Sequence, residues 1–408
     1  MSVVNILSSD NKIPVSPKAA SDFKYGAAVD LGTTTVVLKL YSAEGVCLGK
    51  WSSENPQRCI SADVIGRISK ALDGEGDKLQ KSVTDCISSL LTEGCASIGI
   101  HNTDVDRMVM TGNTAMLYLL TGRNPLSISR FPFKADNLFG EWTQLFGIKT
   151  YLTPCISAFV GGDTVSALLY ADVVSKKETA LLCDIGTNGE MALYKNGDLY
   201  VTSVAAGPAF EGGEISCGCA ATDGALYRVW AEEGEIYSHT VANKPAVGIC
   251  GSGLIDAVSS FLEAGYIDNE GTVLRPLVIK SIGKDISLNQ KDIRALQLAK
   301  SAVAAGIECM LSRTGTDVTE IRAFYLSGAF GVNTDTQSAV NIGLFPSELK
   351  NNACFIGNGA LRGAAKMLMD SGYIDTAKDL ASKAKTLYLG GSTDFNDAFI
   401  RNLKFPQI

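Results

Sequence analysis

Histidine is scarce in this sequence, and its scarcity excludes several kinds of catalytic site. The 408 residues include only His101 and His239, which argues against a zinc site built on histidine and against a Ser-His-Asp triad. The eleven cysteines are scattered, with no CxxC pair and no ferredoxin-like spacing such as C-x4-C-x2-C. The pattern therefore predicts neither a zinc site nor a ferredoxin-like domain.

Long apolar runs and blocks of positive charge are also missing. No uninterrupted apolar run reaches the ~20 residues that a membrane helix needs, and Lys and Arg form no basic stripe. The lack of an apolar run therefore argues against a membrane. The formal net charge of −7 and the lack of a basic stripe argue against a nucleic acid as a partner. Residues 1–24 are mostly polar and predict a tail or linker with no secretory signal. Together with the scattered thiols, this predicts a cytoplasmic protein.

Apolar residues, in contrast, are plentiful, and they are arranged in repeats. Hydrophobic residues make up 46% of the chain and charged residues 19%, which is enough for two domains or one two-lobed unit. Three short patterns occur twice, in the same order, and this order indicates a duplication. The pairs are AVDLGTTTVV (28–37) with LCDIGTNGEM (182–191), VMTGNTAM (109–116) with YLSGAFGV (325–332), and FVGGDTVSALLYAD (159–172) with FIGNGALRGAAKMLMD (355–370).

The spacing between the repeats shows where the two halves differ. Gly32 and Gly112 are 80 positions apart, whereas Gly186 and Gly328 are 142 apart, so the second half carries an inserted subdomain. Apolar periodicity predicts a strand pair around each Gly-Thr turn and helices over 63–98 and 290–315. The expected fold is α/β, with two lobes and a nucleotide cleft between them.

We divide the chain on this basis. Residues 1–24 form the tail, 25–175 the first lobe and 176–385 the second lobe, with the insertion at about 205–290. Residues 386–408 form a C-terminal segment that packs back on the core.

The repeated Asp-x-Gly-Thr turns suit phosphate binding. Backbone N–H groups of a tight turn can cradle phosphate oxygens, and glycine allows close approach. An Asp at the end of the first strand repels phosphate but can hold Mg²⁺, usually through water. Asp30 and Asp184 are that residue in the two lobes. Asp-x-Gly-Thr is also a common hairpin turn, but two copies, each followed by both partner motifs, favour the phosphate interpretation.

Residues 24–372 resemble the actin, hexokinase and heat-shock ATPase (ASKHA) superfamily, whose fold is a duplicated, ribonuclease H-like pair of lobes. DLGTT and DIGTNGE are similar to its two phosphate motifs, and FYLSGAFG to its adenosine motif. GGDTVSALLYAD and IGNGALRGAAKM are similar to its two connecting helices. The resemblance implies that the chain binds ATP and Mg²⁺.

A narrower resemblance extends over nearly the whole chain. GNTAM, FVGGDT, DIGTNGE, AAGPAFEG, ISCG, GICGSGLID, LQLAKSAV and LSGAFG are similar to motifs of the reductive activators of corrinoid proteins. Members of that family use ATP hydrolysis to drive a low-potential electron onto cob(II)alamin in a corrinoid protein. They typically carry a ferredoxin-like domain, for which this sequence has no cysteine set. The resemblance implies the ATPase function. The electron would come from elsewhere, either from a separate iron–sulfur protein or from a cluster held by Cys217 and Cys219 at a dimer interface.

The resemblance also implies roles for individual residues. Asp163, at the start of the first connecting helix, would position the attacking water, or it is only a helix cap. Lys300 would lie against the adenosine, or on the surface. The expected catalytic residues are Asp30, Asp163 and Asp184, with Asp30 and Asp184 on the metal side; the phosphate contacts are Gly32, Thr33, Thr34, Gly186, Thr187 and Asn188; the adenosine contacts are Lys300, Ser327, Gly328, Ala329 and Gly331.

Three further features leave alternatives open. Cys217 and Cys219 would bind an iron–sulfur cluster between the subunits of a homodimer, or they are buried thiols. Glu190 would reach the metal, or it is a solvated strand-start residue. The Gly-Ser-Gly at 251–253 would be an anion site, or a turn capped by Ser252.

The function that these observations favour is an ATP hydrolase that activates a corrinoid or similar cofactor-bearing protein. Two alternatives remain at this point. One is a small-molecule kinase, because the superfamily includes many. The other is a non-catalytic nucleotide-binding regulator.

Overall fold

The computed structural model describes residues 13, 23–328 and 334–408, and it divides into two compact units. The first unit comprises Met1–Asp172 and Gly359–Thr386, and the second Val173–Asn358 and Leu387–Ile408. The expected boundary between the lobes, after residue 175, lies close to the observed division between Asp172 and Val173. Residues 359–385, which were predicted to lie in the second lobe, belong to the first unit, because their helices pack on its elements.

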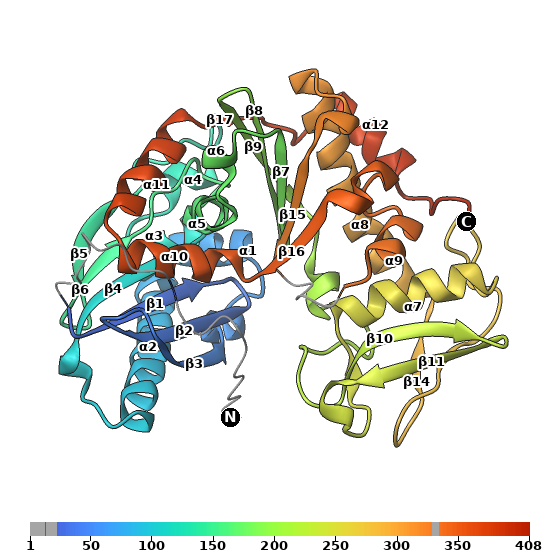
Figure 1. Ribbon diagram of the computed structural model, residues 1–408, viewed down its shortest axis with the longest axis horizontal. Coiled ribbons are helices and arrows are strands. Elements are labelled where there is room, and N and C mark those ends of the chain that lie inside the picture. The colour runs from blue at the N-terminus through green and yellow to red at the C-terminus, as the bar shows by residue number, and fades with distance from the viewer. Residues whose placement is uncertain (1–12, 14–22, 329–333) are drawn as a thin grey trace. The chain divides into compact units, whose positions relative to one another are not determined.

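The sheet of the first unit has the strand order β3-β2-β1-β4-β6-β5 (Figure 1). β1 pairs antiparallel with β2 and parallel with β4, so its carboxyl end lies beside that of β4. The strands are β1 (Tyr25–Leu31), β2 (Thr35–Ser42), β3 (Cys47–Glu54), β4 (Val105–Gly112), β5 (Glu141–Leu145) and β6 (Ile148–Leu152).

The helices of the first unit follow the expected periodicity with one interruption. The helical region predicted over 63–98 is divided at Gly74, whose φ is 96°. Beyond it, Leu79, Val83, Ile87 and Leu91 form the buried stripe of α2. The helices are α1 (Val64–Lys70), α2 (Gly76–Ser97), α3 (Thr114–Leu120), α4 (Leu126–Ser129), α5 (Gly162–Ala171), α10 (Gly359–Met369) and α11 (Gly372–Lys383), with short turns η1 (Pro56–Cys59), η2 (Ala71–Glu75) and η3 (Asn102–Asp104) and the two-residue strand β17 (Lys385–Thr386).

Two of these helices correspond to the repeated third motif. α5 and α10 pack against each other, and α10 also covers β1 and β4. This packing explains why α10 joins the first unit although its sequence follows the second repeat.

The main sheet of the second unit repeats the pattern of the first. Among the strands that belong to this unit the order is β16-β15-β7-β8-β9, with β7 antiparallel to β8 and parallel to β15. Both predicted strand pairs are therefore confirmed. The strands are β7 (Ala180–Ile185), β8 (Asn188–Lys195), β9 (Asp198–Ala205), β15 (Ala323–Gly328) and β16 (Ala353–Gly357), and the helices and turns around this sheet are α6 (Val173–Lys176), η4 (Pro208–Glu211), α8 (Gln290–Thr314), η6 (Val318–Glu320), α9 (Thr336–Asn341) and η7 (Ser347–Asn352).

The segment between β9 and α8 holds additional structure. A three-stranded sheet with the order β11-β10-β12 and the hairpin β13–β14 lie here. Its elements are β10 (Ala225–Glu232), β11 (Glu235–Thr240), η5 (Val241–Asn243), β12 (Gly248–Ile249), α7 (Gly251–Glu263), β13 (Leu277–Ile279) and β14 (Ile286–Leu288).

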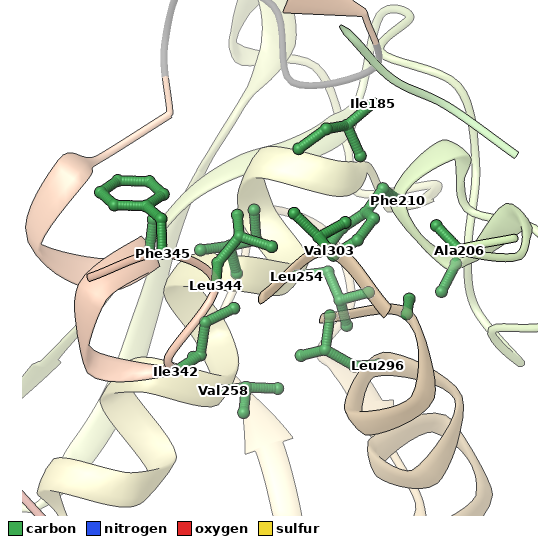
Figure 2. Close-up of a cluster of buried hydrophobic side chains, with 14 of the residues drawn as sticks. Ile185, Ala206, Phe210, Leu254, Val258, Leu296, Val303, Ile342, Leu344 and Phe345 are labelled. Atoms are coloured by element: carbon green, nitrogen blue, oxygen red, sulfur yellow. The ribbon is translucent and has the colours of Figure 1, made fainter. Parts of the chain in front are cut away.

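One hydrophobic core joins this segment to the main sheet. Figure 2 shows Leu254 and Val258 of α7 beside Leu296 and Val303 of α8. Ile185, at the end of β7, belongs to the same cluster. Because the two parts share buried side chains, they form one packed body.

The C-terminal segment packs on α8. Helix α12 (Thr393–Arg401) lies against α8, and Arg313 Nη2 contacts Asp394 Oδ1 at 2.8 Å. Phe405 is only 3% exposed. Among the helices of the described residues, none combines the length and apolarity required to span a bilayer.

Candidate functional site

The first Gly-Thr turn is tight and closed by a backbone hydrogen bond. The N–H of Gly32 donates to the carbonyl oxygen of Thr35 at 3.0 Å. A Cβ atom on Gly32 would lie 2.7 Å from that same oxygen. The turn therefore requires glycine at this position, as a phosphate-binding turn does.

Protein donors hold all three carbonyl groups of this turn. Asn55 Nδ2 donates to the Gly32 oxygen at 2.9 Å, and the Asn55 N–H donates to the Thr34 oxygen at 2.8 Å. Arg67 Nη2 donates to the Thr33 oxygen at 2.8 Å. The turn thus has a defined shape before any ligand binds.

Asn113 connects the turn to the start of α5. Its Nδ2 donates to Thr33 Oγ1 at 3.1 Å, and its Oδ1 caps α3 by accepting from the Met116 N–H at 2.9 Å. Gly161, the N-cap of α5, approaches the Asn113 backbone so closely that a Cβ would lie 2.4 Å from the Asn113 Cα. Asp163 follows in the first turn of α5.

The Asp163 carboxyl has the properties of a general base. The N–H of Thr164 donates to its Oδ1 at 2.7 Å. Desolvation by the surrounding protein raises its pKa to about 6, partly offset by that hydrogen bond. A pKa just below neutral leaves the group ionised at pH 7 and still able to accept a proton.

Asp30 lies near the end of β1, where the sequence analysis places it, and is half-buried. The register pairs Ala28 with Lys39 and Lys39 with Lys50, so both lysines lie on the face of the sheet that carries Asp30.

The second Gly-Thr turn is also closed by its glycine N–H, but the acceptor is two residues on instead of three, and the turn has different support. The Gly186 N–H donates to the Asn188 oxygen, and the Gly207 N–H to the Thr187 oxygen, both at 2.8 Å. Thr187 Oγ1 donates to Glu211 Oε2 at 2.7 Å. A carboxylate therefore supports this turn where a guanidinium supports the first.

Gly328 brings the adenosine motif, FYLSGAFG, against the Asp184 side chain. The parallel register sets Ser327 beside Asp184 and Gly328 beside Ile185. Gly328 has a φ of 96°, and a Cβ there would lie 2.6 Å from Asp184 Oδ1. Only glycine fits this position. Ala329 and Gly331, the other expected adenosine contacts, lie outside the described residues.

Two other residues, Lys300 and Glu190, have surroundings that bear on their expected roles. Lys300 is 1% exposed, and its Nζ donates to the Lys404 carbonyl and lies over the Phe405 ring. It is therefore neither a surface lysine nor part of the nucleotide site proposed below. Glu190 is only 8% exposed and accepts from Ser203 Oγ, so it is not a solvated residue.

The Gly-Ser-Gly segment at 251–253 opens α7, but Ser252 does not cap it. The N-cap is Cys250, and Ser252 Oγ donates to the Tyr227 carbonyl at 3.1 Å. Gly251 approaches the Phe210 carbonyl closely, so a Cβ there would lie 2.1 Å from that oxygen. These contacts favour a packing role for the glycines.

Cys217 and Cys219 are half-buried thiols. Desolvation raises the pKa of each to about 11, with Asp292 adding to the effect at Cys217 and Cys250 at Cys219. Iron–sulfur ligation requires thiolates. Among the described residues, no group of three or more His, Cys, Asp or Glu side chains has the arrangement of a metal site.

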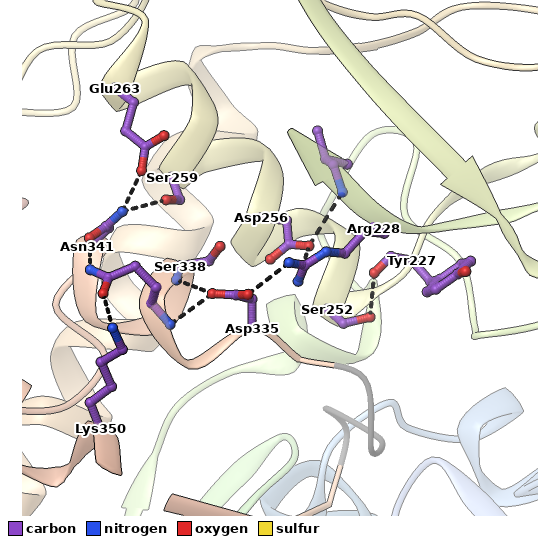
Figure 3. Close-up of polar contacts among 12 residues, drawn as sticks. Tyr227, Arg228, Ser252, Asp256, Ser259, Glu263, Asp335, Ser338, Asn341 and Lys350 are labelled. Atoms are coloured by element: carbon purple, nitrogen blue, oxygen red, sulfur yellow. Dashed lines mark hydrogen bonds and ion pairs between the residues drawn. The ribbon is translucent and has the colours of Figure 1, made fainter. Parts of the chain in front are cut away.

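An ion-pair network includes Asp335, which follows the adenosine motif in the sequence, and Figure 3 shows its members. Arg228 of β10 contacts Asp256 of α7 at 3.2 Å and Asp335, the N-cap of α9, at 2.7 Å. Desolvation raises the pKa of buried Asp256 to about 6, although Arg228 opposes it. The network joins the inserted segment to the start of α9.

Comparison with known proteins agrees with this geometry. Residues 178–408 match the family model described as the C-terminal, ASKHA domain of RACo, and residues 25–176 match the RACo middle region. The chain belongs to the RACo family. This membership confirms both the predicted ASKHA fold and the resemblance to reductive activators of corrinoid proteins.

The chain is also similar to individual proteins. The corrinoid activation enzyme RamQ of Eubacterium limosum is 31% identical over 93% of this chain and 70% of RamQ. The [Co(II) methylated amine-specific corrinoid protein] reductase of Methanosarcina barkeri is 26% identical over 93% of this chain and 77% of the reductase. A solved reductive activator for a corrinoid, iron–sulfur protein is 33% identical with a TM-score of 0.89, covering 95% of this chain and 67% of that one.

The sequence analysis missed several residues around the two turns. Asn113 and Glu211 lie within the quoted motifs GNTAM and AAGPAFEG, so the motifs themselves could have indicated them. Asn55 and Arg67 lie in no repeat, and no local signal marks them.

Proposed function

We propose that this chain binds and hydrolyses Mg·ATP and that the hydrolysis drives reductive activation of a corrinoid-bearing protein. The observation that carries the proposal is the duplicated turn: each copy has an Asp near the end of its first strand and a glycine that leaves no room or little room for a Cβ. The names of the relatives, which are corrinoid activation enzymes and reductases, support the choice of partner.

The donor set fits a magnesium ion held mainly by water and phosphate. Mg²⁺ in nucleotide sites takes one or two carboxylates and completes its shell with water and phosphate oxygens. Asp30 and Asp184 supply those carboxylates in the proposal, and no larger acidic cage occurs among the described residues. When bound, Mg²⁺ would neutralise charge on the phosphates.

The chain's own residues then carry the remaining chemistry. Backbone N–H groups and hydroxyls of Thr33 and Thr34 contact phosphate oxygens. In the second turn the backbone N–H groups of Thr187 and Asn188 do so, and Gly186 allows the close approach. Asp163 orients the attacking water and accepts its proton, because its raised pKa suits a general base. Ser327 and Gly328 form the described part of the adenosine contact. Water attacks the γ-phosphorus, the bond to the ADP oxygen breaks, and phosphate leaves.

Nucleotide binding is tested by thermal unfolding. Ligand at ~100 times its dissociation constant should stabilise the fold by about 2.7 kcal/mol. A melting temperature unchanged by millimolar Mg·ATP, and by a non-hydrolysable analogue, would overturn the assignment of both turns.

Turnover with and without a corrinoid protein separates the three functions that the sequence allows. We expect slow basal hydrolysis that the corrinoid protein stimulates. Rapid basal turnover with phosphate transferred to a sugar would indicate a kinase, whereas binding without turnover would indicate a regulator.

The electron donor in this proposal is a separate iron–sulfur protein, because among the described residues no group of three or more His, Cys, Asp or Glu side chains has the arrangement of a metal site. The test is an absorption spectrum with iron and sulfide assays on anaerobically purified protein. Bound iron that disappears in the Cys217→Ala, Cys219→Ala double variant would overturn this part and indicate a cluster at these thiols.

A further inference from the structure

Arg67 is a fully buried arginine directly behind the first Gly-Thr turn. Its side chain is 0% exposed. Every acceptor described for its guanidinium is neutral: the carbonyl oxygens of Ser61, Thr33 and Ala62, the amide oxygen of Gln57 and the sulfur of Met116. A buried guanidinium usually pairs with a carboxylate, so this one calls for another source of compensating charge.

The residues just before Arg67 explain how its side chain reaches the turn. Asp63 caps α1 by accepting from the Gly66 N–H at 2.8 Å. A Cβ on Gly66 would lie 2.0 Å from Ser61 Oγ, so glycine allows α1 to begin close to Ser61. Arg67 follows immediately, and its Nε donates to the Ser61 oxygen at 2.9 Å while Nη2 reaches Thr33.

The charge persists at neutral pH. Burial lowers the pKa of Arg67 to about 10, with nearby Arg58 adding to the shift and Asp63 opposing it. The side chain therefore carries a full positive charge in a low-dielectric environment, where its field is weakly screened.

Arg67 and Asn55 together decide which way the peptide groups of the turn point. They donate to the oxygens of Gly32, Thr33 and Thr34. In a trans peptide, the C=O and the following N–H point in opposite directions. The N–H groups of Thr33, Thr34 and Thr35 therefore point away from the two donors, as an anion cradle requires.

We propose that Arg67 is a positioning residue for the phosphate groups: it turns the Thr33 carbonyl inward, so that the cradle presents N–H groups, and its uncompensated charge attracts the anion. This inference rests on the proposed ATP function and assigns the buried cation behind the first turn to its triphosphate. Arg67 acts through the turn and does not itself touch the reacting atoms.

The test compares the affinities of Arg67→Met for ATP and for adenosine with those of the parent, using isothermal titration with Mg²⁺ present. We expect ATP affinity to fall at least about tenfold, because a buried unit charge is lost near a polyanion, while adenosine affinity stays within twofold. Arg67→Lys, which keeps the charge without the planar fork, should recover part of the ATP affinity. Arg58→Met is the matched control, since exposed Arg58 pairs with Glu54 and donates to no carbonyl of the turn.

Each outcome decides one question. An ATP-to-adenosine affinity ratio in folded Arg67→Met equal to that of the parent overturns the inference, as does an equal loss in Arg58→Met. If Arg67→Met does not fold, the Arg67→Lys variant provides the test. Its ATP-to-adenosine affinity ratio should be at least about threefold below that of the parent, because Lys lacks the in-plane donors. An unchanged ratio would overturn the inference. A parent that binds no ATP overturns the proposed function instead.

Discussion

The two Gly-Thr turns share a sequence pattern, and in each the glycine N–H closes the turn, but their supporting residues have opposite charges. The first turn is held by the Arg67 guanidinium and by Asn55. The second is held by the Gly207 N–H, and its Thr187 hydroxyl donates to the Glu211 carboxylate. The comparison indicates that duplication kept the turn while its surroundings diverged, so that a cation backs one turn and an anion the other.

Asp163 is a further difference between the repeats, and its removal should have the largest effect. The position that matches Asp163 in the second copy of its motif is Gly359. We expect Asp163→Asn to lower ATP turnover by about 10²- to 10⁴-fold, because a general base is lost. For the parent, kcat/KM should decline below about pH 6, the pKa of Asp163. If Asp163→Asn hydrolysed ATP at the parental rate, Asp163 would have no catalytic role and would serve only at the start of α5.

The same substitution should also stabilise the protein at neutral pH. The folded pKa of about 6 lies above the ordinary value of 3.8, so the native state binds more protons between these values and loses stability as the pH rises through them. The Asn variant lacks this loss. Its gain should be near zero below pH 4 and about 1–3 kcal/mol above pH 6. Urea unfolding at pH 4 and pH 7.5 measures the difference.

The metal-side carboxylates allow a direct comparison of the two turns. Asp30→Asn and Asp184→Asn should each lower turnover about 100-fold or more, as does loss of one electrostatic stabiliser of a transition state, without changing the melting temperature. Asp85→Asn, in an exposed ion pair on α2, is the control. A loss confined to Asp30→Asn would show that the second turn plays no part in metal binding.

The glycines of the two turns should differ in their sensitivity to a methyl group. In Gly32→Ala the added Cβ would meet the Thr35 backbone oxygen at 2.7 Å, whereas in Gly186→Ala it would meet the end of the Glu211 side chain at 3.1 Å. Backbone gives way less readily than a flexible side chain. We expect a cost of about 1–3 kcal/mol for the first change and less than about 1 kcal/mol for the second, measured by urea unfolding. Equal losses of stability in the two variants would mean that the backbone of the first turn shifts to make room for the added Cβ.

The smallest expected effect concerns the opposite charges themselves. Glu211→Gln keeps a partner for Thr187 but removes a negative charge. Without Mg²⁺, it should strengthen ATP binding about threefold to tenfold, since charges several ångströms apart near a surface interact by about 1 kcal/mol. The change is opposite in sign to that expected for Arg67→Met, and titration in EDTA measures it. Weaker binding would show that Glu211 shapes the turn more than it repels the ligand.

Local patterns predicted the elements that depend on near neighbours. The strand pairs around both turns are confirmed. The long helix predicted over 290–315 is also confirmed as α8, and Gly315, with a φ of 58°, ends it. Alternation, helical periodicity and a C-terminal glycine act over a few residues, so they can be read directly from the sequence. Helices were predicted over 63–98, but the position of the break between them at Gly74 was not.

Residues joined across long stretches of chain were beyond such reasoning. Lys300 was assigned to the adenosine or the surface, but the chain returns 104 residues later to cover its amine with the Lys404 carbonyl. Arg67 is 34 residues from the turn that it supports, and Glu211 is 24 residues from Thr187. The sequence by itself determined the two glycine turns and their aspartates, because these are local backbone requirements. The charge behind each turn was decided only by the tertiary structure, because that charge comes from side chains that meet through packing and not through sequence proximity.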